Sequence, residues 1–285
     1  MRLTHTRRVL IACAAASLSL VVTLRGATFT TATQAATGLT VRLSAFSVAG
    51  VRVVPAHVPA GIVPLTVIDD LKVPAGALIF RVNKGYTANQ AIAIFVDLKA
   101  PQDRLNRAAT FVAGFSGFVP GQRLGGWARL TPGSYVVALG GNFQPRTQTF
   151  VVDPAPGAPM GEPASAATVS MRENAFDMPA LLPAGTITLK VVNTDADVHL
   201  GYVARLGQKV SVRQLQRALT QPENKQPAWL HGAPPTGAAG ILSHSQIMWW
   251  TLHLTPGHYA IICPLPGPDG MPHFLMGMLK LFDVR

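Results

Sequence analysis

The chain has 285 residues, 48% of them hydrophobic, and a formal net charge of +11 at pH 7. This length suits two domains of ordinary size. The lysines and arginines form no dense run with interleaved aromatic residues, so the composition argues against a nucleic-acid-binding protein and favours an acidic protein surface as the partner.

The first 36 residues have the pattern of a secretory signal. Arg7 and Arg8 precede an apolar run at residues 9–24, and small residues and threonine follow up to Ala36. A basic start, an apolar centre and a small-residue exit are typical of segments that direct export. The run is shorter than the ~20 residues of a spanning helix, although an uncleaved anchor stays the alternative. We therefore expect an exported protein, either periplasmic, extracellular or attached to the outer face of a membrane.

Residues 38–153 alternate short apolar runs with proline and glycine, which predicts a first all-β domain. Seven short strands separated by turn signals favour a Greek-key sandwich. One or two helical turns are expected near Gln102–Ala109. The expected strands are Leu39–Phe46, Pro64–Asp69, Ala77–Asn83, Ala91–Leu98, Trp127–Leu130, Ser134–Leu139 and Gln148–Asp153.

Four prolines among small residues at 154–167 predict a semi-rigid linker. A second all-β sandwich domain is expected over residues 168–285, with residues 221–243 as a loop rich in proline and glycine. The expected strands are Thr168–Phe176, Thr186–Asn193, His199–Leu206, Met248–Leu254, His258–Cys263 and Gly277–Val284.

One short helix is expected inside the second domain. Ser211 and Gln214 have the spacing of a capping box, and Val212, Leu215 and Leu219 form an apolar stripe. Trp249-Trp250, in a later strand, is interpreted as one core ring and one partly exposed ring.

The second half repeats motifs of the first. Pro74-Ala75-Gly76, a strand and Asn83 resemble Pro183-Ala184-Gly185, a strand and Asn193, while TPGSY at 131–135 resembles TPGHY at 255–259. Pro-Gly fits the central positions of a type II turn. Two copies of one plan are therefore expected. On this alignment the first domain has Asn89 and Leu139 where the second has His199 and Cys263, so we expect the first domain to bind no metal.

The residues that carry chemistry lie near the C-terminus. Nine residues separate Cys263 from His273, and four separate His273 from Met278. A thiolate, an imidazole and a thioether, together with a second imidazole from an earlier strand, form the soft donor set that suits copper. We favour His199 as that second imidazole.

Other residues compete for these roles. A strand rises ~3.3 Å per residue, which places His258 some ~16 Å from Cys263 and outside a shared site. Met271 and Met276 are the rivals of Met278, and methionines most often fill gaps in a core. If export removes Cys13, Cys263 has no internal disulfide partner, and its alternative role is that of an inert buried thiol.

The second half resembles the cupredoxins, the blue copper proteins, over residues 168–285, and the first half resembles them more weakly. The resemblance lies in Pro-Gly-x-Tyr-x3-Cys at 256–263, in the order Cys…His…Gly-Met, and in a histidine after an Asn-bearing strand end. It implies one type 1-like copper ion and single-electron exchange with a redox partner protein. The ligands that it implies are His199 and His273 through imidazole, Cys263 through its thiolate and Met278 as an axial thioether.

The sequence departs from that family in one place and leaves other functions open. Cupredoxins usually have two to four residues between the cysteine and the histidine, whereas this chain has nine, so a more tetragonal site than a blue one is also consistent. The alternatives are copper delivery or sequestration, and a metal-free β-sandwich that serves as an interaction module.

An enzyme is the least expected class. Multicopper oxidases, which resemble tandem cupredoxins, use repeated His-x-His pairs and a His-Cys-His sequence. The chain has no His-x-His, and Cys263 lies between Ile262 and Pro264. No nucleophile elbow, P-loop or dinucleotide-binding fingerprint is present, and no small-molecule substrate is indicated.

Overall fold

Buried and exposed side chains alternate along the strands, as a two-layer sandwich requires. In β13 (Gly185–Asn193), Ile187, Leu189 and Val191 are buried, and the residues between them are more exposed. The strand predicted at Thr186–Asn193 is thereby confirmed.

The computed structural model describes residues 37–43, 50–71, 76–97, 102–116, 121–140, 146–155, 160–231, 238–267 and 269–285. The predicted signal at residues 1–36 lies outside the described residues, as do parts of the predicted strand at 39–46 and of the predicted linker at 154–167. Within the described ranges, no helix has the length and apolar character needed to cross a membrane.

The described part of the first half contains nine strands and two helices. The strands are β1 (Leu39–Leu43), β2 (Val51–Val54), β3 (His57–Pro59), β4 (Gly61–Asp69), β5 (Gly76–Val82), β6 (Ala109–Ser116), β7 (Arg123–Leu130), β8 (Gly133–Gly140) and β9 (Thr147–Asp153). The helices are α1 (Ala88–Val96) and α2 (Gln102–Ala108).

The described part of the second half contains nine strands and three short helices. The strands are β10 (Ala167–Arg172), β11 (Ala175–Asp177), β12 (Leu181–Leu182), β13, β14 (His199–Leu206), β15 (Ala238–Leu242), β16 (Ile247–Leu254), β17 (Gly257–Ile262) and β18 (Leu279–Val284). The helices are α3 (Val212–Leu219), the 3-10 turn η1 (Glu223–Lys225) and α4 (Ala228–His231).

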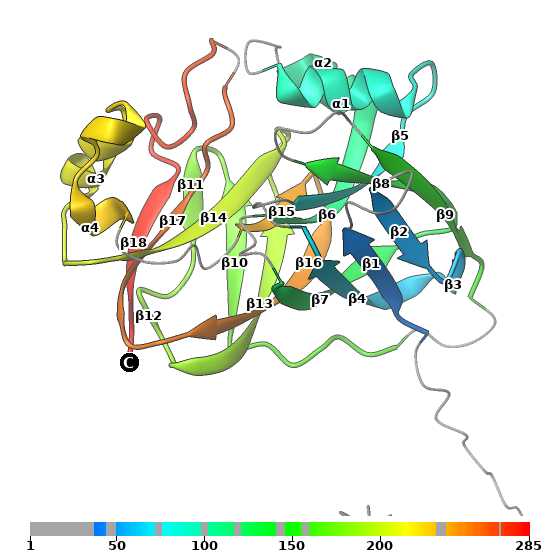
Figure 1. The fold of residues 1–285 in the computed structure, drawn as a ribbon, viewed down its shortest axis with the longest axis horizontal. Coiled ribbons are helices and arrows are strands. Elements are labelled where there is room, and N and C mark those ends of the chain that lie inside the picture. The colour runs from blue at the N-terminus through cyan, green and yellow to red at the C-terminus, as the bar shows by residue number, and fades with distance from the viewer. Residues whose placement is uncertain are drawn as a thin grey trace, which may run out of the picture. The chain divides into compact units, whose positions relative to one another are not determined.

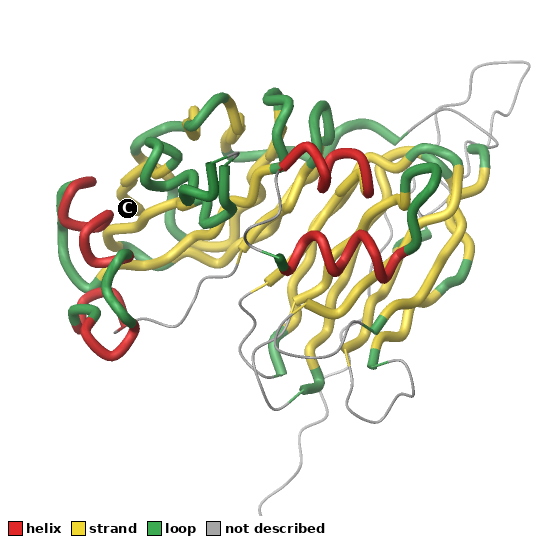
Figure 2. The backbone as a smooth tube through the Cα atoms, turned by 90° about the horizontal axis from the view of Figure 1, so that it is seen from above, coloured by secondary structure: helices red, strands yellow, loops and turns green. Residues whose placement is uncertain are grey.

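The strands form two sheets, and each half of the chain contributes to both (Figure 1). The eight-stranded sheet has the order β11-β10-β13-β16-β7-β4-β1-β2. The ten-stranded sheet has the order β12-β18-β17-β14-β15-β6-β5-β8-β9-β3. Strands dominate the chain and the helices are few and short (Figure 2). The all-β class and the two tandem sandwiches predicted from the sequence are confirmed.

The two halves repeat one set of pairings. β1 runs parallel to β4, and β4 pairs with β7; β10 runs parallel to β13, and β13 pairs with β16. In the other sheet β5 lies between β6 and β8, as β14 lies between β15 and β17. Strand for strand, β1–β9 therefore correspond to β10–β18.

This correspondence corrects one part of the predicted repeat. β4 and β13 are equivalent, so Pro59-Ala60-Gly61, not Pro74-Ala75-Gly76, matches Pro183-Ala184-Gly185. The same offset of 124 positions relates Asp69 to Asn193 and Tyr135 to Tyr259. Leu139 therefore stands at the position of Cys263, as predicted. The position of His199 falls at Ala75, which lies outside the described residues, and not at Asn89, which lies in α1.

The halves join where β16 pairs with β7 and β15 pairs with β6. The β16–β7 pairing places Trp250 opposite Gly126, which is its own counterpart in the repeat. Position 126 has no room for a side chain, because a Cβ there would lie 2.2 Å from the carbonyl oxygen of Trp249. Trp249 and Trp250 are both fully buried, so the expected partial exposure of one ring is wrong. Arg129 and Lys190, from opposite halves, cover the Trp249 ring and both bind Glu162.

The strand predicted at Ala91–Leu98 is wrong, because residues 91–96 belong to α1. Thr87 caps α1 and its side chain accepts from the backbone N–H of Gln90, while the Gln90 side chain accepts from the N–H of Thr87. This capping box starts a helix and outweighs the strand preference of the isoleucines that follow. The other predicted capping box, Ser211 with Gln214, is present at the start of α3.

Helix α3 packs on a small core of its own. Leu215 is buried together with Leu206, Ile262 and Phe274. Val212 was predicted to belong to the same apolar stripe, but it is 41% exposed. The segment at 221–243, predicted to be a loop throughout, contains η1, α4 and β15. Its strand was missed because β15 is an apolar stretch among prolines and glycines that pairs only with distant segments.

Candidate metal centre

Strand register brings the predicted ligands together. β17 ends at Ile262 opposite Leu279 of β18 and opposite Tyr202 of β14. The next residue, Cys263, therefore lies beside Met278 on one side and beside Gly201 on the other. Directly opposed residues of antiparallel strands project from the same face, and the diagonal neighbour on that face is within reach. That diagonal neighbour of Cys263 is His199.

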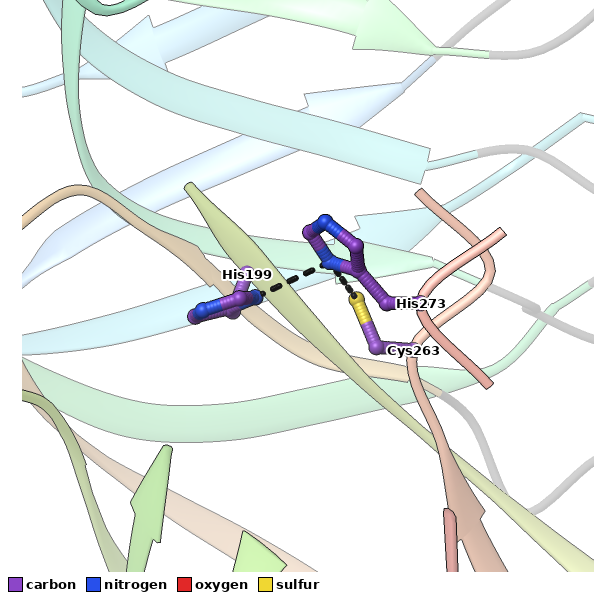
Figure 3. Close-up of side chains that lie close together, drawn as sticks. All are labelled: His199, Cys263 and His273. Atoms are coloured by element: carbon purple, nitrogen blue, oxygen red, sulfur yellow. Dashed lines mark hydrogen bonds between the residues drawn. The ribbon is translucent and has the colours of Figure 1, made fainter. Parts of the chain in front are cut away.

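Three donor atoms converge at this point. Nδ1 of His199 lies 3.1 Å from Nδ1 of His273, and Nδ1 of His273 lies 3.4 Å from Sγ of Cys263 (Figure 3). One donor atom from each of the three residues lies within 4.8 Å of the others. All three side chains are 1% exposed or less. Donors about 2.0–2.3 Å from one ion lie roughly 3–4 Å from each other, so this separation fits a shared cation.

The nine-residue loop returns His273 to the thiol by doubling back on itself. Pro266 and Pro272 form an isolated antiparallel bridge, and the N–H of His273 donates to the carbonyl of Leu265 at 2.8 Å. The N–H of Phe274 donates to the carbonyl of Cys263 at 3.0 Å. The extra length forms a small hairpin, and His273 reaches Cys263 in spite of it.

Met278 is the methionine placed at this site. It is fully buried, whereas Met271 is 43% exposed and Met276 is 37% exposed. The N–H of Met278 donates to the carbonyl of His273 at 2.9 Å, and its carbonyl accepts from the N–H of Cys263 at 3.1 Å. Its backbone is thus tied to both Cys263 and His273.

Asp195 orients His199 and was not among the predicted site residues. Its Oδ2 lies 2.8 Å from Nε2 of His199. Burial opposes ionisation of Asp195, but the hydrogen bond and charge of His199 outweigh it, so the pKa of Asp195 lies below its ordinary value. A carboxylate at Nε2 holds the proton there and leaves the Nδ1 lone pair facing the site. The spacing of four residues between Asp195 and His199 was the signal available in the sequence.

Asn193 holds the loop between β13 and β14 in shape. Its Nδ2 donates to the carbonyls of Asp197 and Leu242 at 2.7 and 2.8 Å, and its Oδ1 accepts from the N–H of Asp195 at 2.9 Å. This fully buried amide closes the turn that presents both Asp195 and His199. Its contacts therefore both close the turn and support the site.

Burial keeps the side chains of His199, Cys263 and His273 uncharged in the metal-free protein at neutral pH. Burial, helped by the charge of His199, lowers the pKa of His273 to about 4, and burial also lowers the pKa of His199 against the attraction of Asp195. Burial raises the pKa of the Cys263 thiol to about 12, although the N–H groups of Leu200 and Leu265 donate to its sulfur. A cation that displaces the thiol proton is needed to make this sulfur a thiolate at neutral pH.

The other histidines considered from the sequence lie elsewhere. His258 pairs with Asp283 at 2.6 Å, and His253 lies 3.3 Å from the hydroxyl of Thr186. Among the described residues, neither belongs to the His199–Cys263–His273 group. Two imidazoles, one thiol and a neighbouring methionine match the donors that copper takes in trigonal sites with a weak axial thioether.

No protein-family model matches the chain, and no curated relative was found. Among solved structures it is similar to reduced auracyanin from the photosynthetic bacterium Roseiflexus castenholzii, with 22% identity over 41% of this chain and 94% of that one, at a TM-score of 0.28. Auracyanin A of Chloroflexus aurantiacus, described as a "blue" copper protein, is 19% identical over 41% of this chain and 99% of that one, at a TM-score of 0.26.

The multicopper oxidase of Campylobacter jejuni is 10% identical over 78% of this chain and 53% of that one, at a TM-score of 0.25. The auracyanins match a part of the chain about one domain long, whereas the oxidase matches most of it. The predicted resemblance to cupredoxins agrees with these likenesses and rests on the strand pairing and the donor residues of the chain itself. The chemistry of the site is argued from its own residues.

Proposed function

We propose that the protein binds one copper ion through His199, Cys263 and His273, with Met278 as a weak fourth ligand, and that it carries single electrons. The observation that supports this is the convergence of two imidazole Nδ1 atoms and one Sγ within 4.8 Å in a buried site. A copper ion bound there supplies a couple between Cu(I) and Cu(II).

The protein's own contribution is a fixed arrangement of donors. Asp195 holds the His199 ring, and the N–H groups of Leu200 and Leu265 face the sulfur of Cys263. Hydrogen bonds at the sulfur and to the imidazoles tune the potential of such sites. Ligands that are fixed before an electron arrives move little afterwards, which favours fast transfer.

Closure of the site favours electron transfer over an enzyme reaction at the metal. His199, Cys263 and His273 have almost no solvent contact, so a substrate has no open path to a ligand position. An electron crosses a thin layer of protein without such a path. The sequence also lacks the His-x-His pairs of a trinuclear oxygen-reducing centre.

The partner and the location complete the proposal. Without Arg2, Arg7, Arg8 and Arg25 of the signal pattern, the formal net charge of +11 becomes 11 − 4 = +7, which suits an acidic redox protein, whose encounter a basic surface accelerates. The signal pattern in residues 1–36 and a metal centre built on a single cysteine suit an exported protein.

Copper titration of the full chain tests the proposal. Addition of Cu(II) is expected to give one bound ion per chain and a thiolate-to-copper absorption band, which reversible reduction bleaches. Cys263→Ser is expected to abolish the band, whereas Cys13→Ser, the matched control, leaves it unchanged. A purified chain that takes up no stoichiometric copper contradicts the proposal and favours the metal-free interaction module.

Copper delivery is the second candidate, and the exposed thioethers on the metal loop favour it. Met271 and Met276 are both partly exposed near His273, and thioethers are ligands that Cu(I) selects. Stopped-flow mixing of the loaded protein with a Cu(I) chelator separates the two functions. An electron carrier releases copper slowly and exchanges electrons fast, whereas a delivery protein releases copper within the mixing experiment.

A further inference from the structure

Helix α2 belongs to the first half but contacts both ligand-bearing loops of the second half. Nε2 of Gln102 donates to the carbonyl of Pro266 at 2.7 Å, and Nδ2 of Asn106 donates to the carbonyl of Ala196 at 3.2 Å. Pro266 lies in the loop between Cys263 and His273, and Ala196 lies in the turn that leads to His199. Figure 1 shows α2 beside the orange-red loop that contains Pro266.

Gln102 is a polar residue that the first turn of α2 buries. It is only 3% exposed, and its Oε1 finds no hydrogen-bond partner among the described residues. A buried polar atom without a partner has lost its hydrogen bonds to water and gained none in return, which destabilises the fold. An apolar residue of similar volume would avoid that cost, so the side-chain bond to Pro266 is what the amide adds within the described part of the chain.

The anchor of α2 is independent of the metal loops. Nδ2 and the N–H of Asn83, just after β5, donate to the carbonyls of Asn106 and Ala108, both at 3.0 Å. The helix is therefore fixed to the first sandwich, and its two amides reach outward from a rigid support. Asn106 also binds the carboxylate of Asp197, the residue two before His199.

The two contacts add a tie to the first half for two segments whose other bonds lie within the second half. The loop from Cys263 to His273 is long, and a longer loop has more conformations to lose when its ends are fixed. Its proline at 266 has no N–H, so its carbonyl is the backbone group by which a neighbour can hold it. α2 holds this carbonyl and, one helical turn further on, the carbonyl of Ala196.

We propose that α2 is a positioning element of the metal centre, in which Gln102 and Asn106 fix the His273 loop and the His199 turn relative to each other. The first half of the molecule thus covers the site of the second half through α2. The proposal rests on the proposed copper site for its spectroscopic part only, because closure of the loops over Cys263 does not require a metal.

The test compares Gln102→Leu, Asn106→Ala and the double variant in the full chain. Leucine keeps the volume of Gln102 and removes the donor. Arg104→Ala, an exposed change on the same helix, is the control. Circular dichroism and thermal unfolding of the metal-free variants establish that they fold, and each single variant is measured as well as the pair.

In the metal-free protein, alkylation of Cys263, followed by mass spectrometry of its peptide, is expected to be about tenfold faster in the double variant, since two hydrogen bonds that close the loops are lost. In the copper-loaded protein, release to a chelator is expected to accelerate by a similar factor, and the Cu(II) paramagnetic resonance spectrum is expected to shift. Copper stoichiometry stays at one ion.

Rates and spectra equal to those of the wild type in the folded double variant would overturn the role of α2. If the wild type takes up no copper but the alkylation difference persists, the proposed copper function fails and the positioning role of α2 stands. If only copper release changes and alkylation does not, α2 does not close the loops and the proposal is wrong.

Discussion

The two halves of the molecule share a corner that is nearly identical in detail. The Tyr135 hydroxyl donates to the carbonyl of Thr131 at 2.9 Å, and the Tyr259 hydroxyl donates to the carbonyl of Thr255 at 2.9 Å. Each ring stacks on a phenylalanine, Phe150 and Phe282 respectively, with centroids 5.4 Å apart in both halves. The frame of the sandwich is thus copied with little change.

The halves differ at the strand ends. Oδ1 of Asp69 accepts from the N–H two residues on, as Oδ1 of Asn193 does, so the same turn follows both β4 and β13. In the first half the residue two after Asp69 is the buried Leu71, whereas in the second half that position holds Asp195, which orients a ligand. Turns and strands set the frame, and single residues at its end decide whether it offers a cluster of metal donors.

The largest effect is expected when the thiol of Cys263 is replaced by the side chain of its counterpart. Cys263→Leu removes the thiolate and should abolish the copper band, with a loss of at least about a hundredfold in Cu(II) affinity, because no other thiolate is at hand. Overpacking should cost about 1–3 kcal/mol of unfolding free energy. Absorption titration and urea unfolding measure the two effects.

The reverse change, Leu139→Cys, sharpens the comparison. It should create no copper band, because position 75, the counterpart of His199, is alanine. A second band in Leu139→Cys would show that the frame alone suffices for a site, and the contrast between the halves would then need another explanation.

Acid should weaken the second half more than the first in the metal-free protein. Burial lowers the pKa of His273 to about 4, so between about pH 6.5 and pH 4 the unfolded chain binds a proton that the folded chain does not. The unfolding free energy therefore falls as the pH falls through this window, by up to about 3 kcal/mol from this group. Hydrogen exchange at pH 4.5 should show lower protection in β14 and β17 than in β5 and β8.

His273→Gln provides the control for this pH effect. The variant lacks the buried base, so its unfolding free energy should vary less between pH 6.5 and pH 4 than that of the wild type. Equal slopes for the two proteins would assign the acid sensitivity to other groups, such as the carboxyl of Asp195, whose pKa lies below its ordinary value.

The His199–Cys263–His273 cluster could be predicted because the donors that copper takes limit the choice of residues. One thiol after export, a histidine and a methionine at short spacing leave few combinations, and a strand geometry of ~3.3 Å per residue excludes His258. The helix α1 could not be predicted from hydrophobicity alone, because its isoleucines suit a strand as well, and the capping box of Thr87 and Gln90 was the better signal.

The correct repeat and the contacts of α2 depend on long-range pairing. Two Pro-Ala-Gly segments precede strands in the first half, and only the parallel pairing of β1 with β4 identifies the one at 59–61 as the counterpart of 183–185. The approach of Gln102 to Pro266 joins residues 164 positions apart, and no local pattern indicates it. Asp195 was missed for a different reason. Its spacing of four positions to His199 can be seen in the sequence, but such spacings are common and do not by themselves indicate a contact.

Asp195→Asn should weaken copper binding without removing the site. The amide still accepts a hydrogen bond from Nε2 of His199 but lacks the charge, so the imidazole becomes a poorer donor. Loss of such an orienting group typically costs 10–100-fold in metal affinity. Asp283→Asn, at a carboxylate that pairs with His258, is the control. Competition titration against a chelator measures both, and equal affinities in the two variants would remove Asp195 from the site.

The smallest effects are expected at the shared corner, where Tyr135→Phe and Tyr259→Phe should cost similar amounts. Each loses a hydroxyl that binds a backbone carbonyl, for about 1 kcal/mol of unfolding free energy. Tyr135→Phe should lower the unfolding free energy slightly more than Tyr259→Phe does, because the Tyr135 oxygen also accepts from the N–H of Thr131 at 3.1 Å. Urea unfolding of the metal-free variants measures the difference.

Because both sheets run through both halves, we expect one cooperative transition in each variant, and two separate transitions would show that the repeated frames are stable independently of each other.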